Sequence, residues 1–106
     1  MDMDQLGRAL AAFAVLSPTH LPIHFVQVFL FVAEAERPCT FQEVMAALDL
    51  SNSAVSRTVM ALGQETRKGQ PGFDLLLVEK DPAEGRRYII MLTQKGKALS
   101  RQIEQL

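Results

Sequence analysis

Hydrophobic residues recur at helical spacing in two adjacent stretches near the middle of the chain, residues 40–48 and 51–62. They are Phe41, Val44, Met45 and Leu48 in the first stretch and Val55, Val59 and Leu62 in the second. Thr40 and Glu43 have the spacing of a capping box, in which each side chain bonds the other residue's backbone N–H. Ser51 is a favourable N-cap for the second stretch. The pattern therefore predicts two capped helices joined by a short turn.

The other side of the second predicted helix carries short polar side chains and one arginine. Its residues are Ser51, Asn52, Ser53, Ser56, Arg57 and Met60. Hydroxyls, an amide and a guanidinium suit base edges and phosphates, and Arg57 could bond guanine bidentately. We interpret the pair as a helix-turn-helix whose second helix enters the major groove of double-stranded DNA. An ordinary pair of packed helices without a DNA role is the alternative.

Two more helices are predicted before this pair. Residues 4–16 place apolar side chains along one side, and Pro18 then interrupts the pattern. The helix predicted over residues 22–36 starts at Pro22 and is apolar on nearly every side, so we expect it to be central and buried all round. The first helix either covers the core or packs against a second subunit.

After the helix pair, the sequence predicts a hairpin and a last helix. Residues 73–80 and 87–92 have the composition of strands, and residues 81–85 between them have the composition of a turn. Thr93 is a good N-cap for a helix over residues 94–106. A hairpin that follows a helix-turn-helix in this way is a wing.

Arg86 and Arg87 lie at or just past the tip of the predicted wing. Arginines there could enter the narrow, electronegative minor groove or clamp the DNA backbone. The alternative is that they pair with Asp81 and Glu84 of the hairpin. Both can hold, since a bridge from Asp81 to Arg86 could orient that arginine toward DNA.

Three other basic residues are candidates for phosphate contacts. Arg67 and Lys68 belong to a basic, Gly-rich loop over residues 63–72, which either touches the DNA backbone or is a solvated connection. Lys95 lies in the first turn of the last helix, where a cation is unfavourable with respect to the helix dipole. A nearby phosphate would relieve that cost, and chance explains the placement equally well.

The bulk composition limits the functions to consider. A chain of 106 residues with 48% hydrophobic content is one globular domain, residues 1–106. Its net charge of −1 does not suggest a nucleic-acid binder, but residues 1–50 carry a net −4 and residues 51–106 a net +3. The positive half contains the predicted recognition helix, and affinity for DNA depends on the local patch.

Several kinds of site and location are not expected. One cysteine and two histidines exclude a disulfide framework and a Cys-rich zinc site, and we expect no cofactor. Because no nucleophile with its base, no carboxylate pair and no phosphate-binding Gly loop stands at useful spacing, we do not expect an enzyme. Cys39 is either a buried packing residue or a redox-sensitive thiol activated by the nearby helix. An acidic start and no apolar run near ~20 residues indicate no signal peptide and no membrane span, hence a cytoplasmic protein.

Three short segments together resemble the winged helix-turn-helix of the multiple-antibiotic-resistance regulator (MarR) family. They are LSNSAVSR at 50–57, DPAEGRR at 81–87 and LTQKG at 92–96. The resemblance implies dimeric, sequence-specific regulators of transcription, often released from DNA by a small ligand. Three features depart from the family: Gly85 separates the acidic residue from the arginines, the loop at 63–72 is long, and the C-terminal helical region is short. That region forms the dimer and shapes the ligand pocket in typical members. A minimal regulator without a small-molecule effector, as in mobile elements, is therefore an equal alternative to a ligand-sensing one.

The predicted fold is mainly α with a small β-hairpin: a winged helix-turn-helix over residues 22–93 with an extra N-terminal helix and a C-terminal helix. Our functional hypothesis is a homodimeric DNA-binding regulator, acting as a repressor and dimerising through the helices at 4–16 and 94–106. The alternative is a protein-interaction or replication-associated module of a mobile element, which the near-neutral charge and an apolar Met60 on the outer helix face would favour.

Overall fold

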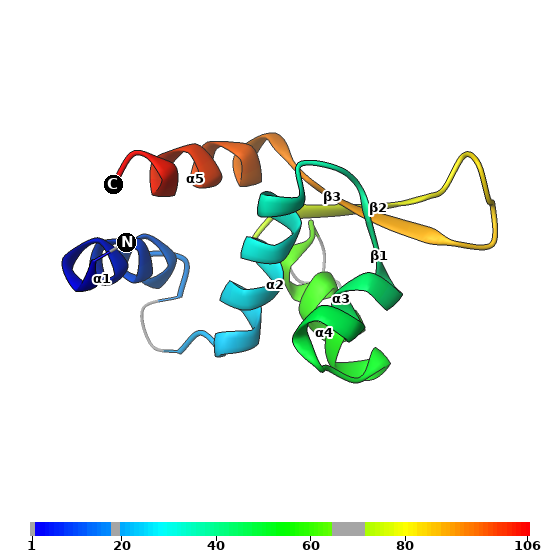
Figure 1. The fold of residues 1–106 in the computed structure, drawn as a ribbon, viewed down its shortest axis with the longest axis horizontal. Helices are drawn as coiled ribbons and strands as arrows, with labels where there is room; N and C mark the ends of the chain where they lie inside the picture. The colour runs from blue at the N-terminus through cyan, green and yellow to red at the C-terminus, as the bar shows by residue number, and fades with distance from the viewer. Residues whose placement is uncertain (1, 18–19, 65–71) are drawn as a thin grey trace.

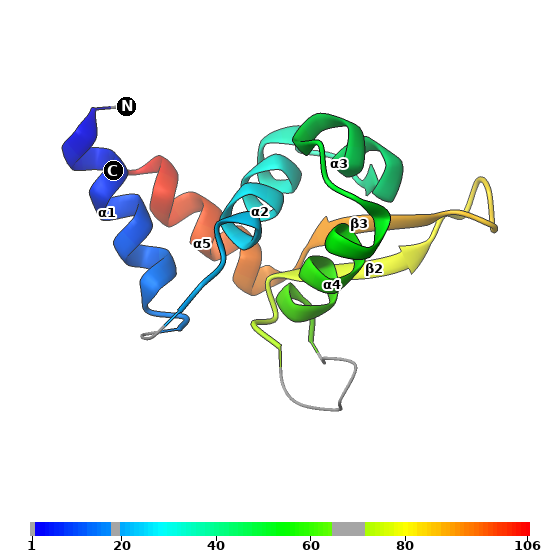
Figure 2. The ribbon, with the colours of Figure 1, turned by 90° about the horizontal axis from the view of Figure 1, so that it is seen from below.

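A computed structural model describes residues 2–17, 20–64 and 72–106, and these form five helices and a three-stranded antiparallel sheet (Figure 1). The elements are α1 (Met3–Ala14), α2 (Ile23–Ala35), β1 (Cys39–Thr40), α3 (Phe41–Leu48), α4 (Asn52–Leu62), β2 (Leu76–Lys80), β3 (Tyr88–Leu92) and α5 (Gln94–Glu104). In both ribbon views the β2–β3 hairpin extends from the end of the molecule opposite α1 (Figures 1 and 2). No described helix is long and apolar enough to span a bilayer.

The predicted helix caps are confirmed. At the start of α3, the Glu43 amide donates to the Thr40 hydroxyl at 3.1 Å, and the Thr40 amide donates to the Glu43 carboxylate at 2.9 Å. The hydroxyls of Ser51 and Thr93 accept the amide of the third residue that follows them, at 3.1 and 3.0 Å. Asp2 caps α1 in the same way, which was not predicted from the sequence.

The sheet contains one strand that was not predicted. β1 pairs with β3 and not with its neighbour in sequence, so that the strand order is β1-β3-β2. Cys39 faces Ile90 across the first pair of strands, and Val78 faces Ile90 across the second. Because β1 runs directly into the N-cap of α3, the pairing ties the helix-turn-helix to the wing.

The predicted start of the first wing strand was wrong. β2 begins at Leu76 and not at residue 73, because Asp74 adopts a left-handed conformation with φ of 57°, which interrupts an extended strand. The amides of Phe73 and Leu75 instead donate to carbonyls at the C-terminal end of α4, at 3.1 and 2.7 Å. These residues join α4 to the sheet.

One hydrophobic core connects the helices and the sheet. Its fully covered side chains include Val28, Phe29, Cys39, Val44, Val55, Leu62, Leu75, Leu76 and Ile90. Phe29 of α2 meets Phe13 of α1 edge to face, with ring centroids 5.5 Å apart. The location of the core confirms that α2 is a central helix.

The expectation that α2 is buried all round was wrong. Ile23 and Leu30 are 60% and 40% exposed, because the described elements cover only part of its circumference. The neighbouring helix α1 likewise leaves Leu6 and Leu10 nearly half exposed. An apolar surface therefore remains at this end of the molecule.

The start of α5 lies against the connection between α4 and β2. The Thr93 amide donates to the Leu75 carbonyl at 3.0 Å, and the Thr93 hydroxyl donates to the Asp74 carbonyl at 2.5 Å. A Cβ atom on Gly96 would collide with the Leu75 carbonyl oxygen, so this approach requires a glycine. It fixes the point from which the β2–β3 hairpin projects.

Candidate nucleic-acid interface

One side of α4 is anchored in the core, as predicted. Val55, Val59 and Leu62 are at most 3% exposed. Thr58, which was not among the predicted core residues, belongs to the same side; it is 2% exposed, and its hydroxyl donates to the Ala54 carbonyl at 2.8 Å. Anchoring on this side fixes the rotation of the helix, and thereby the direction in which its outer side points.

The predicted outer side of α4 is accessible for most of its residues. Asn52, Ser53 and Arg57 are exposed, whereas Ser56 and Met60 are half-buried. The Arg57 Nε donates to the Ser53 carbonyl at 3.3 Å, which holds the side chain along the helix surface. No ion pair engages Arg57 within the described part of the chain. Its guanidinium is available to an external acceptor.

The wing turn holds one of its two arginines in place. Asp81, only 9% exposed, accepts from Arg87 Nε at 3.1 Å and from the guanidinium terminus at 2.6 Å. The hydrogen bond from Arg87 keeps the pKa of the Asp81 carboxyl below its usual value, so that it remains ionised and keeps the arginine bound. The bridge considered above, from Asp81 to Arg86, is thus replaced by a bridge from Asp81 to Arg87.

Arg86 is exposed at the tip and makes no ion pair among the residues that the structure describes. The backbone turn is closed by Glu84 N to Asp81 O at 3.2 Å and by Arg87 N to Glu84 O at 3.0 Å. The carboxylate of Glu84 does not bond either arginine within the described residues. One wing arginine is therefore oriented by the fold, and the other is free to adapt to a ligand.

Among the remaining basic candidates, the structure describes only Lys95, which lies away from Asn52 and Ser53. Arg67 and Lys68 lie outside the described residues. Lys95 is exposed in the first turn of α5. This turn packs against Leu75, whose amide is bonded to the C-terminal end of α4. Asn52, Ser53 and Ser51 lie at the opposite, N-terminal end of α4.

Two side chains of the hairpin, Lys80 and Tyr88, were not selected from the sequence. They are directly opposite each other across β2 and β3, and both are exposed. The alternation of side chains along the strands would have placed them on one face, but the strand boundaries were needed first. Cys39 is a buried packing residue, and burial raises the pKa of its thiol, against the activated thiol considered above.

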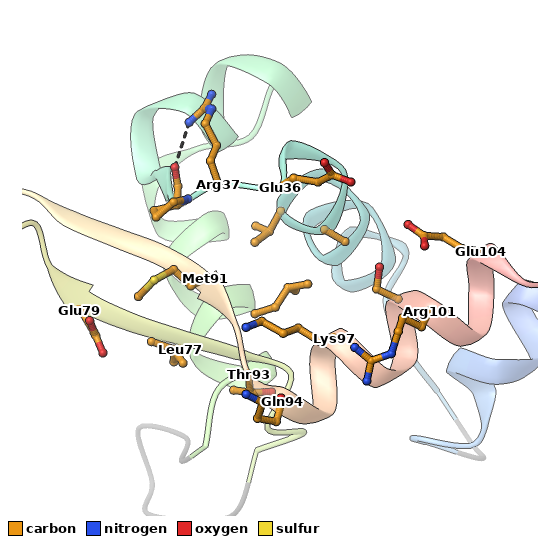
Figure 3. Close-up of a pocket in the computed structure, with 15 residues that line it drawn as sticks. Glu36, Arg37, Leu77, Glu79, Met91, Thr93, Gln94, Lys97, Arg101 and Glu104 are labelled. Atoms are coloured by element: carbon orange, nitrogen blue, oxygen red, sulfur yellow. Dashed lines mark hydrogen bonds between the residues drawn. The ribbon is translucent and has the colours of Figure 1, made fainter.

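A groove of about 630 Å³ lies between the β2–β3 hairpin, α5 and the end of α2 (Figure 3). The side chains of Leu77, Glu79 and Met91 line it from the strands, and Lys97 points into it from α5. Its basic residues are matched by Glu36, Glu79 and Glu104. Among the described residues no group of three His, Cys, Asp or Glu side chains is placed to hold a metal ion.

Solved structures of bacterial regulators resemble this arrangement. A mutant of MepR from a multidrug resistant S. aureus clinical isolate gives a TM-score of 0.72 at 17% identity over 96% of this chain and 66% of that chain. Overoxidized AbfR bound to DNA gives 0.66 at 20% identity over 96% and 64%. A cysteine-to-serine mutant of MarR from E. coli, in complex with operator DNA, gives 0.63 at 20% identity over 96% and 67%.

This chain has the MarR-like winged-helix fold. The fold resemblance expected from the three sequence segments is confirmed, and it extends to the helices that precede the helix-turn-helix. No protein-family model matches the sequence, and the comparison with curated proteins gives no match. The chain spans about two thirds of the length of the three MarR-like proteins.

Proposed function

We propose that this chain is a sequence-specific, double-stranded DNA-binding regulator of transcription, which acts as a homodimeric repressor. The observation that carries the proposal is the outer side of α4. The opposite side of α4 is fixed in the core, while Asn52, Ser53 and Arg57 stay accessible to a major groove that the helix would enter. Arg57 is the principal base contact in this proposal, with the serine hydroxyls and Asn52 beside it.

The wing supplies the second contact. Arg86 inserts into the minor groove or pairs with the backbone, and Arg87 is held ready beside it by Asp81. Two of the MarR-like neighbours are described as bound to DNA, which supports the same use of the fold here. Arg67, Lys68 and Lys95 are proposed as auxiliary phosphate contacts.

The proposed dimer uses the N-terminal and C-terminal helices. Met3, Leu6 and Leu10 form a stripe along α1 and are 89%, 48% and 43% exposed. The end of α5 lies beside α1, where Gln5 Nε2 donates to the Leu106 carbonyl at 3.0 Å. A second copy seated on this end would cover the stripe and place the two recognition helices ~34–36 Å apart, one DNA turn.

The dimer has a direct test in sedimentation velocity. Leu10→Glu puts a charge into the proposed interface and should shift the protein from dimer to monomer. Arg8→Glu is the control, because it introduces the same side chain on the solvated side of α1, although it also removes the ion pair between Arg8 and Asp4. Wild-type protein that stays monomeric at micromolar concentration would contradict the dimer.

Selection of bound sequences from random duplex DNA tests the function as a whole. We expect enrichment of a palindrome whose half-sites are one helical turn apart. Placing that sequence in a reporter promoter should lower transcription when the protein is expressed. No enrichment of any duplex would refute the proposal, and enrichment of a single half-site would refute its dimeric form.

The alternative of a protein-interaction module loses part of its support. It was favoured by an apolar Met60 on the outer side of α4, and Met60 is half-buried in the structure. The groove behind the hairpin does not identify an effector, since its basic and acidic residues balance. Regulation of transcription without enzymatic activity remains the function that the geometry supports best.

A further inference from the structure

We propose that Lys80 and Tyr88 form a third DNA contact, to the phosphate backbone, between the recognition helix and the tip of the wing. The proposal rests on the function proposed above. It concerns the face of the β2–β3 hairpin that carries Leu76, Val78, Lys80, Tyr88 and Ile90, which we call the front face.

The strand register places these side chains on one face. Leu76, Val78 and Lys80 alternate along β2, and Val78 and Lys80 are paired with Ile90 and Tyr88. Paired residues on antiparallel strands project to the same side, with Cβ atoms ~4.5–5.5 Å apart. Lys80 and Tyr88 are therefore neighbours whose polar ends can reach the same stretch of a ligand.

The base of the front face is packed into the hydrophobic core, whereas the opposite face lines the groove beside α2 and α5. Leu76 and Ile90 are fully buried in the cluster that also contains Val55 and Val59 of α4. Lys80 and Tyr88 lie on the same face but farther along the hairpin, toward Arg86 at the tip. In the proposed complex, a duplex that contacts both α4 and the tip passes along this part of the hairpin.

The burial changes abruptly along the front face. Leu76 and Ile90 are 0% exposed, whereas Val78 and Tyr88 are 41% and 48% exposed. The core thus covers only the base of the hairpin, and an aromatic ring and a branched side chain remain in water beyond it. Apolar surface of this kind, beside a cation, suits a deoxyribose-phosphate chain, whose sugars are apolar and whose phosphates are anionic.

The two side chains have complementary roles in this contact. The Tyr88 hydroxyl donates to a phosphate oxygen while its ring lies against the neighbouring deoxyribose. The Lys80 ammonium adds a charge that releases counterions from the backbone. Lys80 directly precedes Asp81, which holds Arg87, so the contact continues the row of cations at the wing.

A purely structural role for Tyr88 predicts a different result. If the ring only contributes to the stability of the hairpin, then Tyr88→Phe keeps the ring and leaves DNA binding unchanged. If the hydroxyl binds a phosphate, the same variant keeps its melting temperature and loses affinity by about tenfold, as for a hydrogen bond to a charged group.

The experiment is fluorescence anisotropy with the selected duplex over a range of salt concentrations. Lys80→Gln should weaken binding to specific and nonspecific duplexes alike, and should lower the magnitude of the salt slope by ~0.9, the value for one phosphate. Lys97→Gln is the matched control, because Lys97 points into the groove behind the sheet, and it should leave affinity and slope unchanged.

The outcomes separate this inference from the proposed function. If Arg57→Ala weakens binding while Lys80→Gln or Tyr88→Phe retains wild-type affinity and slope, the inference is overturned and the proposed function stands. If Lys97→Gln changes binding as much as Lys80→Gln, the effect is one of total charge and the contact is also overturned. If wild-type protein binds no duplex, both fail.

Discussion

The surface formed by α4 and the wing differs from the groove behind the hairpin in how its charges are arranged, although both contain basic residues. The front face and the tip of the hairpin carry Lys80, Arg86 and Arg87 against Asp81 and Glu84, and Asp81 is already paired with Arg87. The third carboxylate of the hairpin, Glu79, lies on the opposite face. In the groove, the basic residues are matched one for one by acidic residues. The basic residues of the groove are Arg37, Lys97 and Arg101, and the acidic residues are Glu36, Glu79 and Glu104.

The difference teaches that a count of basic residues does not locate a phosphate site. A polyanion needs a local excess of positive charge, and screening at physiological salt limits the reach of each charge to ~8 Å. The groove presents no such excess, whereas the front face and the tip of the wing do. Net charge over the whole chain, at −1, conceals this contrast.

The largest effect is expected at Gly96, where α5 packs closely against Leu75. Both the wing and the groove depend on this contact. Gly96→Ala places a methyl group against the Leu75 carbonyl, and the shift that relieves it should lower the free energy of unfolding by about 3 kcal/mol or more. The measurement is denaturant unfolding followed by circular dichroism. Both regions should lose their structure together.

Gly85→Ala is the control for that substitution. Gly85 is exposed in the wing turn, and a Cβ there meets nothing within 4 Å. The free energy of unfolding of the Gly85→Ala variant should stay within about 0.5 kcal/mol of the wild-type value, as for an ordinary surface substitution. Equal losses for the two variants would show that the close approach of α5 to Leu75 is not what constrains position 96.

A pair of arginine substitutions compares the two regions directly. Arg57→Ala should cost ~1–3 kcal/mol of discrimination between the selected sequence and unrelated DNA. Arg101→Ala removes an exposed helix arginine from the groove and should leave discrimination unchanged. The check is a competition gel shift with both duplexes, and similar losses for the two variants would remove the basis for assigning the interface to α4.

The smallest effect is expected from a change of pH on the stability contributed by the ion pair between Arg37 and Glu43, which borders the groove. Arg37 and the Thr40 amide hold the pKa of the Glu43 carboxyl at about 2, below its usual 4.5. Because the folded pKa is lowered, the stabilisation is present above pH 4.5 and is lost as the pH falls toward 2. Both side chains are partly exposed, which keeps the effect small.

Glu43→Gln isolates that contribution, since glutamine keeps the capping geometry without the charge. Its melting temperature should be slightly below wild type at pH 7, and the difference should shrink as the pH approaches 2. A difference that is constant with pH would show that the charge on Glu43 does not stabilise the fold.

Features that depend on neighbours in sequence were predictable. The caps at Thr40, Ser51 and Thr93, the buried stripe of α4 and the turn at residues 81–85 all follow from local chemistry. They were enough to identify the helix-turn-helix and the wing.

Features that depend on distant partners were not predictable. β1 contains two residues, too few for a strand pattern, and it forms only because Ile89 and Ile90 lie beside it. The exposure of Ile23 depends on which helices cover α2, and the choice of Arg87 by Asp81 depends on the geometry of the turn. The role of each candidate DNA contact, including Arg57, remains a prediction from the surface chemistry.

The two-residue strand β1 couples the position of the wing to that of α3. Cys39 and Thr40 are bonded to β3 on one side and continue without a break into the first turn of α3 on the other. A tilt of the hairpin about the pair of Cys39 and Ile90 would therefore carry the start of α3 with it. In the proposed complex with DNA, the contacts made by the wing and by the helix-turn-helix would therefore change together.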